Sequence, residues 1–505
     1  MIESDDGYGV STGYTYGYYR RLSPSWLRLM ATIHSVPFPA GEPFRYFELG
    51  YGQGVSLNVH AATNPGEYWG TDYNPEHVKF ARQMAEASGA PVHLLDLSFE
   101  ELAERDDLPQ FHVIVAHGIW SWISDSSRAA ILRFVDKHLE PGGLLYLSYN
   151  ALPGAASGIA VQRLIRTLTQ SMDPALSESE RFERARVYLR ALESSPKSHF
   201  ANYPKAKERL DRILNAKSTY VLHEYTVDAW EPMLLTDVAA ALRPIGLEFI
   251  GSAELDSRTA SQATDDGPPT DFGATAMQAV PESLMISEAL HDFEIDQQFR
   301  SDLFVRGSIH LGTAVRTQLP MEQRFVLTRH PDVVDFVADE VSDEEDAALC
   351  REVLIAFSNR SDGMATFSDI ASQLPTASRE RISRSILLCA RADALHPVLD
   401  GFDEVEAIRS RKLNDTLAFD RVGKTKITVR ASPLVGAGVP CFEPVPAFEA
   451  AISQGAETAN QLIHYVNNSP RDDALVRFSA IEYLQNAIVY LEKRKVLEHL
   501  SVEIL

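Results

Sequence analysis

The sequence predicts an α/β protein whose main domain is a parallel sheet of seven strands. Three observations predict it. Short apolar runs alternate with helix-like runs over residues 44–150, a glycine-rich turn follows the first apolar run, and the pattern resumes over 230–311 after a purely helical stretch, 151–225. Strand–helix alternation at this spacing is typical of parallel sheets with right-handed crossovers.

Composition narrows the class of protein. A chain of 505 residues suggests about three domains. The 47 Lys and Arg residues against 70 Asp and Glu give a net charge of −23, which argues against a general nucleic-acid binder and fits a basic partner. Three scattered cysteines favour neither a disulfide framework nor a zinc cluster. The acidic start and the absence of a long apolar run lead us to expect a cytoplasmic protein without membrane association.

The spacing of apolar residues and the positions of helix-capping residues predict the helices and strands of the main domain. Residues 23–36 should form a helix, with Ser23 as N-cap and Pro24 in the first position. The expected strands are 44–50, 68–72, 92–96, 111–118, 144–150, 247–255 and 299–311. The expected helices are 56–63, 75–88, 126–143 (ended by Pro141-Gly142-Gly143) and 230–246, and the polar stretch 256–273 should be a loop.

The C-terminal part has a different pattern. Helices are expected over 343–358, 366–375 and 378–398, the last running towards a strand, and this order fits either a winged helix or another small helical domain. An amphipathic helix is expected over 478–500. The predicted units are an N-terminal lid segment (1–43), the sheet domain (44–315) with a helical insertion (155–225), a mainly α, winged-helix-like domain (316–410) and a C-terminal α+β domain (411–505).

The first candidate ligand site is the turn Gly50-Tyr51-Gly52-Gln53-Gly54, which follows Glu48 at the end of a strand. Glycines there allow a sharp turn and let a ligand approach the backbone. The G-x-G-x-G spacing differs from the G-x-G-x-x-G of dinucleotide sites and, with the preceding acid, favours S-adenosylmethionine. A dinucleotide site and a plain strand–turn–helix junction are the alternatives.

Acidic residues end the next two strands. Asp72 can accept hydrogen bonds from a ribose diol, and Asp96 is placed to meet the amine of adenine. Each could instead be a turn or helix-cap residue. After the fourth strand, His117 could orient a cofactor or accept a proton. Trp120 and Trp122 could line an apolar or cation–π pocket, or pack in the core.

Four segments together, FELGYGQGVSLNV, GTDYNPEHV, VIVAHGIWSWIS and LYLSYNALPG, resemble bacterial class I S-adenosylmethionine-dependent methyltransferases with a methyltransferase regulatory region. The best understood members are rickettsial protein-lysine methyltransferases. The resemblance implies a Rossmann-like methyltransferase sheet, a helical insert used for dimerisation, a middle domain and a C-terminal domain. It also implies S-adenosyl-L-methionine as cofactor, with S-adenosyl-L-homocysteine as product.

Carried over by position, the resemblance implies a set of site residues. The cofactor contacts would be Glu48, Gly50, Tyr51, Gly52, Gly54, Asp72, Tyr73, Asp96, Leu97, His117 and Gly118. Of the remaining candidates, His117, Tyr19 and Trp122 match the family pattern, whereas the others are candidates only by their position along the expected substrate channel. The catalytic candidates are His117, Tyr19 and Tyr149, and the substrate candidates are Tyr14, Trp120, Trp122 and Asn150. The chain departs from the family at Tyr51, which could narrow the entrance or stack on the cofactor. It also departs in GYYRRLSP, where only Tyr19 and Pro24 match.

The expected reaction is SN2 transfer of the sulfonium methyl group, most readily to a protein side chain such as lysine. A small-molecule acceptor is the alternative. A non-catalytic scaffold is disfavoured by the intact glycine turn and acids. A DNA-binding regulator is disfavoured by the net charge and by the few clustered basic residues in 340–400. A homodimer is expected, and no metal or nucleic acid.

Overall fold

The structure is a computed structural model of the 505-residue chain. It describes residues 17–216, 225, 229–255, 284–307, 323–329, 331, 334, 344–360, 363–399, 404–419, 429–432 and 435–440. Tyr14, the loop expected over 256–273 and the helix expected over 478–500 lie outside these ranges.

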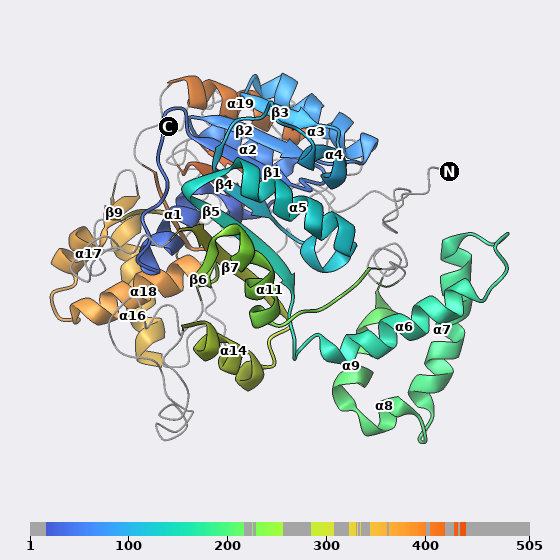
Figure 1. The fold of residues 1–505 in the computed structure, drawn as a ribbon. Coiled ribbons are helices and arrows are strands. Elements are labelled where there is room, and N and C mark those ends of the chain that lie inside the picture. Colours follow the sequence, from blue (N-terminus) through green and yellow to red (C-terminus); the bar gives the residue numbers. More distant parts are fainter. Residues whose placement is uncertain are drawn as a thin grey trace, which may run out of the picture.

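A seven-stranded sheet with the order β3-β2-β1-β4-β5-β7-β6 forms the centre of the molecule (Figure 1). β7 is antiparallel to both neighbours, β5 and β6, and the β1–β5 ladder is parallel. The strands are β1 (Arg45–Leu49), β2 (Glu67–Thr71), β3 (Val92–Leu95), β4 (Phe111–Ala116), β5 (Leu139–Asn150), β6 (Leu247–Ser252) and β7 (Phe299–Arg306). This confirms the predicted Rossmann-like methyltransferase sheet; the sequence pattern did not reveal that β7 runs antiparallel.

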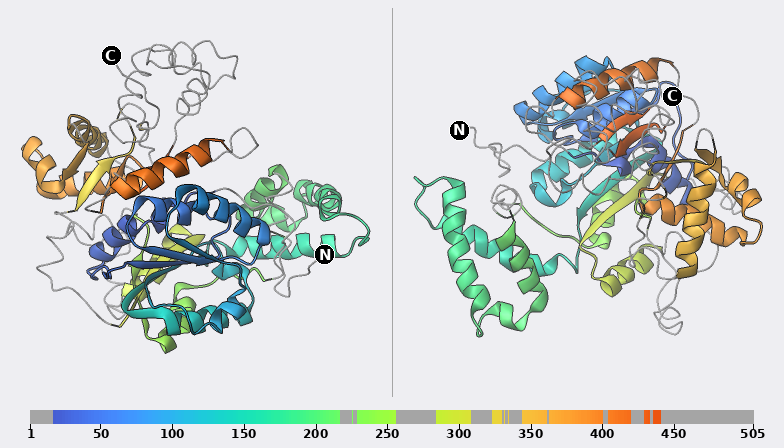
Figure 2. Two further views of the ribbon diagram at one scale, coloured as in Figure 1. Left: turned by 90° about the horizontal axis from the view of Figure 1, so that it is seen from above. Right: turned by 180° about the vertical axis from the view of Figure 1, so that it is seen from behind.

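Helices cover both faces of the sheet, as the view from above shows (Figure 2). Side chains alternate along each strand, so Tyr46, Val113 and Tyr146 enter one apolar core, whereas Phe47, Ile114 and Leu147 enter the other. The first face carries α1 (Pro24–Ile33), α2 (Val55–Thr63) and α3 (Pro75–Ser88). The second carries α4 (Phe99–Ala103), α5 (Asp125–His138), α11 (Leu235–Leu242) and α14 (Leu284–Ile295).

Cap chemistry explains the helix starts that the sequence predicted. Ser23 accepts from the Trp26 backbone N–H at the start of α1, and Pro24 occupies the first helical turn. Asn74 caps α3 with Pro75 next to it, and α3 ends at Gly89 in the left-handed conformation. Both helices begin at the predicted residues.

The predicted end of α5 is wrong. α5 ends at His138, and Pro141-Gly142-Gly143 lies inside β5, which begins at Leu139. Leu139 already pairs with Phe111 of β4, with a register shift before Val113 pairs with Leu144. The Pro-Gly-Gly stretch therefore produces an irregularity within the strand and does not end the helix. Similarly, α11 begins at Leu235, five residues after the predicted start.

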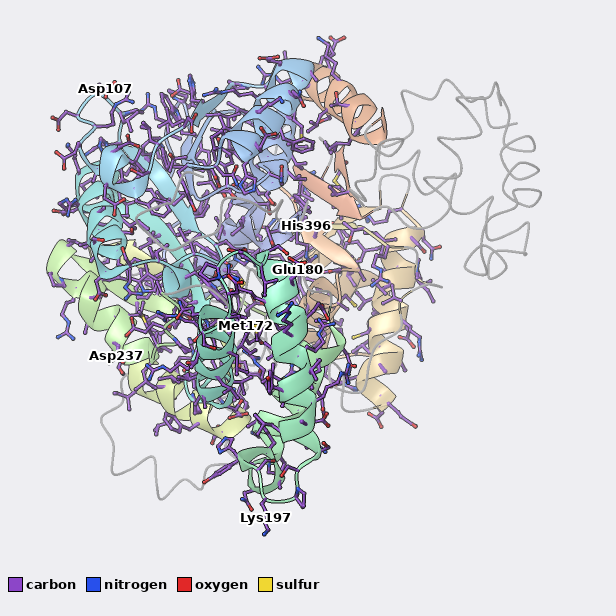
Figure 3. The ribbon with its side chains drawn as sticks, turned by 90° about the vertical axis from the view of Figure 1, so that its right-hand side faces the viewer. Asp107, Met172, Glu180, Lys197, Asp237 and His396 are labelled. Atoms are coloured by element: carbon purple, nitrogen blue, oxygen red, sulfur yellow. The ribbon has the colours of Figure 1, made fainter. Side chains whose placement is uncertain are left out.

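The insertion between β5 and β6 is helical, as predicted, and forms a lobe beside the sheet domain (Figure 1). It consists of α6 (Ala156–Gln170), α7 (Glu178–Ser194), α8 (His199–Asn202) and α9 (Pro204–Asn215), and it has its own apolar core around Ile165, Phe182 and Leu210. Lys197, between α7 and α8, lies at the far tip of this lobe (Figure 3).

The middle unit contains α16 (Glu344–Ser358), α17 (Phe367–Gln373), α18 (Arg379–Arg391) and a three-stranded antiparallel sheet. The sheet order is β10-β8-β9, with β8 (Arg324–Leu327), β9 (Met364–Thr366) and β10 (Leu395–Pro397). Arg381 and Arg384 on α18 pair with Asp346 at the start of α16. These cations are engaged within the unit, which weakens the hypothesis of a DNA-recognition helix.

The remaining described elements pack on the sheet domain. α19 (Glu404–Phe419) lies against α2 and α3 (Figure 1), and the hairpin of β11 (Val429–Ser432) and β12 (Ala437–Pro440) contacts α2. The predicted boundary between residues 410 and 411 therefore falls inside α19. Likewise α1, which we predicted to belong to a lid segment, lies in the main core, with Trp26 and Met30 at most 1% exposed.

Among the described residues, no helix has both the length and the apolar character needed to cross a membrane.

Candidate functional site

The glycine turn lies at the carboxyl end of β1, at the start of α2. Gly50, Gly52 and Gly54 have φ of +65°, +57° and +70°, a region that L side chains rarely adopt. A Cβ on Gly54 would lie 2.6 Å from Ala81 Cβ on α3, whereas a Cβ on Gly52 would meet nothing within 4 Å. Gly54 thus allows close helix packing, and the backbone at Gly52 is accessible to a ligand.

Asp72, which follows β2, fixes the conformation of this turn. Its Oδ2 accepts from the Gly52 backbone N–H at 2.8 Å, and its Oδ1 accepts from the Asn74 backbone N–H at 2.9 Å. His77 Nδ1 lies 3.2 Å from Oδ1. The carboxylate is 8% exposed. Each carboxylate oxygen can accept about two hydrogen bonds, so Oδ2 keeps capacity for a ligand hydroxyl, and Oδ1 does so when Nδ1 is the nitrogen of His77 that carries no proton.

Glu48, near the end of β1, is 4% exposed, and its Oε2 has no hydrogen-bond partner among the described residues. Burial raises the pKa of the Glu48 carboxyl to about 8, and the nearby charge of Asp72 acts in the same direction. A buried polar atom without a partner costs free energy. This arrangement is suited to a ligand that brings a cation to Oε2.

Asp96 follows β3 and is exposed. It does not cap the next helix, because Ser98 is the N-cap of α4 and forms a capping box with Glu101. The helix-cap alternative for Asp96 is therefore wrong. Leu97 and Tyr73, the neighbours of the two acids, are half-buried.

Tyr51 does not narrow the entrance of the turn. Its side chain is 6% exposed and packs in the first core, and its hydroxyl donates to the Leu95 carbonyl at 3.4 Å. Gly70 gives it room, since a Cβ there would lie 2.8 Å from Tyr51 Cδ1. The tyrosine thus packs beneath the turn, whereas we expected this departure from the family pattern to narrow the entrance or to stack on the cofactor.

His117 follows β4 and is held from one side by two hydroxyl groups of β5. Its Nδ1 lies 2.9 Å from the Tyr146 hydroxyl and 3.1 Å from Ser148 Oγ, and Ser148 Oγ also accepts from the Gly118 backbone N–H at 2.8 Å. Burial lowers the pKa of His117 to about 4, with a smaller contribution from the Arg21 cation. The imidazole is therefore neutral at physiological pH.

Two aromatic rings lie against this imidazole. The Tyr19 ring centroid is 4.3 Å from that of His117, and the Phe299 centroid is 6.0 Å away in an edge-on arrangement. Tyr19 is 37% and Phe299 38% exposed. The backbone N–H of Tyr19 donates to Ser56 Oγ on α2 at 2.8 Å, which ties this cluster to the glycine turn. Sequence reasoning missed Phe299, because only the antiparallel course of β7 brings its first residue to this edge.

Tyr149 is not part of this cluster, which corrects the prediction that it is catalytic. Alternation along β5 directs Tyr146 and Ser148 to one face of the sheet and Tyr149 to the other. Tyr149 is 1% exposed, and its hydroxyl donates to Asp302 Oδ2 at 2.6 Å.

Replacing Tyr149 with Phe should therefore leave the expected methyl transfer almost unchanged and lower stability by about 1–3 kcal/mol, the cost of a lost hydrogen bond to a buried carboxylate. Rate measurements and urea unfolding on the same preparation check this. A large loss of rate with unchanged stability would restore Tyr149 to the site.

The tryptophans and Asn150 also differ from expectation. Trp120 is 2% exposed and packs in the second core, so it does not line a substrate pocket. Trp122 is half-buried and stacks on Trp230 with 5.8 Å between centroids. Trp230 Nε1 donates to Asn150 Oδ1 at 2.9 Å. Trp122 and Asn150 thus help to fix the segment after the insertion.

A buried charged cluster underlies Tyr149. Arg300 is 4% exposed and lies 2.5 Å from Asp292 Oδ1, 2.8 Å from Asp302 Oδ1 and 3.3 Å from Glu288 Oε2. Burial raises the pKa of Asp292 to about 6, although the Arg300 cation acts in the opposite direction. This cluster joins α14 to β7 on the face opposite His117.

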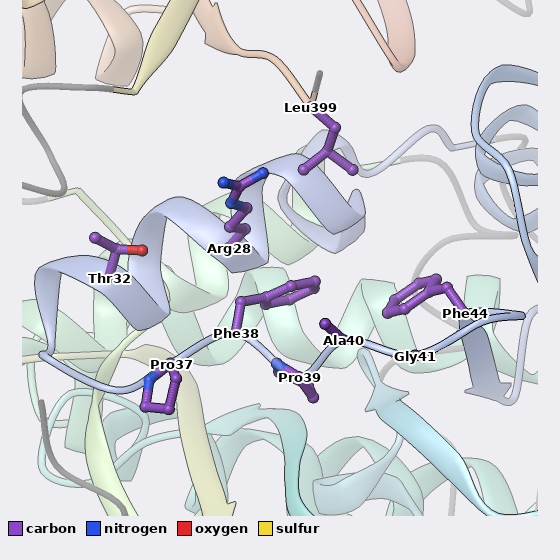
Figure 4. A pocket seen from close by; sticks show the side chains of 9 residues that line it. All are labelled: Arg28, Thr32, Pro37, Phe38, Pro39, Ala40, Gly41, Phe44 and Leu399. Carbon is purple, nitrogen blue, oxygen red and sulfur yellow. The ribbon is translucent and has the colours of Figure 1, made fainter. Parts of the chain in front are cut away.

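A cavity of about 470 Å³ lies elsewhere, between α1 and the segment that leads into β1 (Figure 4). Phe38, Phe44 and Pro39 line it, with Arg28 and Leu399 at its side. Because Phe44 precedes β1, this cavity is at the opposite end of the strand from the glycine turn and is separate from the candidate site. Within the described ranges, no group of three or more His, Cys, Asp or Glu is arranged to hold a metal ion.

Comparisons with known proteins agree with this fold. Residues 47–143 match a methyltransferase domain, and residues 217–306 match a predicted methyltransferase regulatory domain. An uncharacterised protein of Synechocystis is 32% identical over 455 residues, covering 86% of this chain and 85% of the relative. An uncharacterised protein of Rickettsia prowazekii is 27% identical over 207 residues, 40% of this chain and 80% of the relative.

Solved structures show the same fold. The structure of PKMT2 from Rickettsia typhi in complex with AdoHcy superposes with a TM-score of 0.66 at 16% sequence identity. The matched region covers 96% of this chain and 99% of the PKMT2 chain. The protein is therefore a class I S-adenosylmethionine-dependent methyltransferase. It belongs to the family in which the methyltransferase domain is joined to a methyltransferase regulatory domain. Here the matched regulatory region includes β6 and β7, and so completes the central sheet.

Proposed function

We propose that Glu48, Asp72 and Asp96 bind three parts of S-adenosylmethionine. The partnerless Oε2 of Glu48 fits the ammonium group of the methionine part, Asp72 fits the ribose hydroxyls, and the exposed Asp96 fits the adenine amine. The accessible backbone at Gly52 leaves room for the ligand between them. When bound, the cofactor supplies an electrophilic methyl group, and the protein residues hold and orient it.

The Glu48 assignment predicts a pH dependence of binding. With a pKa of about 8, this carboxyl is largely protonated at pH 7 in the free protein. A ligand ammonium group favours the carboxylate, so binding should release a proton and affinity should fall below pH 8, by up to about tenfold per pH unit. Titration of AdoHcy (S-adenosylhomocysteine) in buffers of different ionisation enthalpy counts the released protons. Glu48→Gln should weaken binding at pH 8.5 and abolish the proton release; unchanged release would exclude Glu48.

We further propose that the methyl acceptor is a lysine side chain of a protein. The observation that carries this is the cluster of Tyr19, Phe299 and the neutral His117 imidazole at the carboxyl end of β4. Its two aromatic rings are more than a third exposed, which fits a long side chain entering from a macromolecule better than an enclosed small molecule. The resemblance to rickettsial protein-lysine methyltransferases and the net charge of −23 support a basic protein partner.

The chemistry needs a neutral amine beside the methyl group. A carboxylate at this position would favour the ammonium form more strongly than aromatic rings do. The neutral His117 can accept a hydrogen bond from the amine at Nε2 in the tautomer whose Nδ1–H donates to the Tyr146 hydroxyl. The amine lone pair forms a bond to the methyl carbon as the carbon–sulfur bond breaks. The product ammonium then loses its proton to solvent before another transfer.

Labelled methyl transfer to a lysine-rich unfolded polypeptide tests the acceptor. Acid hydrolysis should recover the label as methylated lysine, and His117→Ala should reduce the rate by about 10–100-fold. His93→Ala, an exposed histidine on β3, is the matched control and should keep the wild-type rate. Transfer to small amines but to no polypeptide would favour the small-molecule alternative.

We infer, in addition, that two copies associate through the insertion. Its helix α7 exposes Val187 (69%), Tyr188 (61%) and Leu192 (38%), an apolar stripe on the outside of the lobe. Light scattering should report a dimer for the full chain and a monomer for a chain lacking residues 155–220. Tyr188→Glu should also give a monomer, and a dimer in both cases would contradict the inference.

A further inference from the structure

Four consecutive residues, Tyr18 to Arg21, connect the candidate acceptor site to three other parts of the chain. Tyr18 contacts the β11–β12 hairpin, and the Tyr19 ring lies against that of His117. Arg20 contacts the middle unit, and Arg21 forms an ion pair with Glu254, which follows β6. Contacts of Tyr18 and Arg20 span about 370–420 residues of sequence. Tyr19, which lies against the imidazole, is thus flanked by residues anchored in the C-terminal third.

Arg20 is held by the turn between α18 and β10. Its guanidinium donates to the Leu395 carbonyl at 3.2 Å and to the Ala390 carbonyl, and it forms an ion pair with Asp393. It also lies 4.6 Å above the Trp26 ring. The Arg20 side chain is 10% exposed. The planar guanidinium can donate several hydrogen bonds and stack on an aromatic ring at the same time, and a shorter side chain cannot make all of these contacts.

Tyr18 is anchored on the other side. Its hydroxyl accepts from the Gly438 backbone N–H at 2.7 Å, and its ring lies 5.7 Å from that of His60 on α2. A Cβ on Gly438 would lie 2.7 Å from Tyr18 Cζ, so this approach requires glycine. The two anchors fix the backbone on both sides of Tyr19, in addition to its own bond to Ser56.

We propose that the middle unit and the β11–β12 hairpin position Tyr19 at the acceptor site, with Tyr18 and Arg20 as the positioning residues. The role of Tyr19 in binding the acceptor rests on the proposed function. The anchoring of Tyr19 by contacts of Tyr18 and Arg20 with the C-terminal third does not depend on the proposed function. The Tyr19 side chain is more than a third exposed, so burial alone does not fix its position. Its position over the His117 ring therefore depends on how the neighbouring residues hold the backbone. A ligand or partner that moves the C-terminal third would then change methyl transfer without touching the cofactor.

Hydrogen–deuterium exchange on the full chain tests the link without any methyl acceptor. The amides of Tyr19, Leu22 and Ser23 are hydrogen-bonded and should be protected in the wild type. Arg20→Met, and the milder Asp393→Asn and Tyr18→Phe, should speed exchange over residues 19–23 by about tenfold or more, with α2 and β4 unchanged. Arg21→Ala is the matched control. Arg21 is 44% exposed and pairs with Glu254, which lies outside the middle unit and the hairpin, so this exchange should stay within about twofold of the wild-type rate.

A second readout separates positioning from loss of structure. AdoHcy affinity should stay within about twofold of wild type in Asp393→Asn and Tyr18→Phe, while transfer to the lysine polypeptide falls about tenfold, mainly through KM. Arg20→Lys should restore part of the rate. If exchange changes only around residues 390–396, Arg20 is a structural contact and the proposal is wrong. If exchange over 19–23 rises as expected but no polypeptide is methylated by the wild type, the proposed acceptor fails and the link stands.

Discussion

Replacing Asp72 with Ala should abolish measurable binding of AdoHcy. The carboxylate holds the glycine turn through the Gly52 and Asn74 backbone N–H groups, and it is our candidate for both ribose hydroxyls. Hydrogen bonds to a charged group contribute about 1.5–3 kcal/mol each, so two lost ligand bonds and a loosened turn should weaken binding by more than about 100-fold. Isothermal titration calorimetry measures this directly.

Two further variants make this result interpretable. Asp72→Asn keeps an acceptor for one backbone N–H and should bind more weakly than wild type but better than Asp72→Ala. Asp107→Ala removes an aspartate that is 67% exposed at the surface of the sheet domain (Figure 3), and this variant should bind as wild type. Affinity of Asp72→Ala within tenfold of wild type, in a folded protein, would place the ribose elsewhere.

Replacing Arg300 with Met should destabilise the protein strongly, by more than the loss of the Tyr149 hydroxyl. Arg300 is the cation between Asp292, Asp302 and Glu288, and all four side chains are 10% exposed or less. Removal of one partner from a buried ion pair costs about 3–5 kcal/mol, because the remaining charges stay buried without compensation. Urea unfolding followed by circular dichroism should show a clearly lower midpoint.

Arg105→Met is the matched control, because Arg105 pairs with Asp107 at the surface, where water and salt screen the pair and it contributes little to stability. The double variant Arg300→Met, Asp302→Asn should recover part of the loss, since it removes one of the uncompensated carboxylates. A midpoint for Arg300→Met equal to that of Arg105→Met would mean that the cluster adapts by taking up protons.

The sheet and its ligand-binding edge could be predicted because local signals specify them. Apolar runs define the strands, and Asn74 with Pro75 defines the start of α3. The glycine turn and the acids Asp72 and Asp96 follow their strands directly, so the parallel ladder alone brings them to one edge. The Pro-Gly-Gly stretch misled the prediction, since such residues also occur at irregular strand starts.

The rest of the site depends on contacts between distant parts of the chain. Side chains alternate between the two faces of β5, so Tyr149 lies on the face opposite His117. Nothing in the local sequence pattern identified which face of β5 would contact the histidine. Phe299 reaches the site only because β7 is antiparallel. The anchors of Tyr18 and Arg20 involve Gly438 and Asp393, which no local pattern relates to the N-terminal segment.

A crystal structure of the protein with AdoHcy would test the central claim, that the carboxyl edge of β1–β4 is the methyl-transfer site. We expect the ligand amino group at Glu48, the ribose at Asp72, the adenine at Asp96 and the sulfur facing the side of His117 that carries Tyr19 and Phe299. AdoHcy in the cavity beside Phe38 and Phe44, or bound with its sulfur directed away from His117, would contradict the claim.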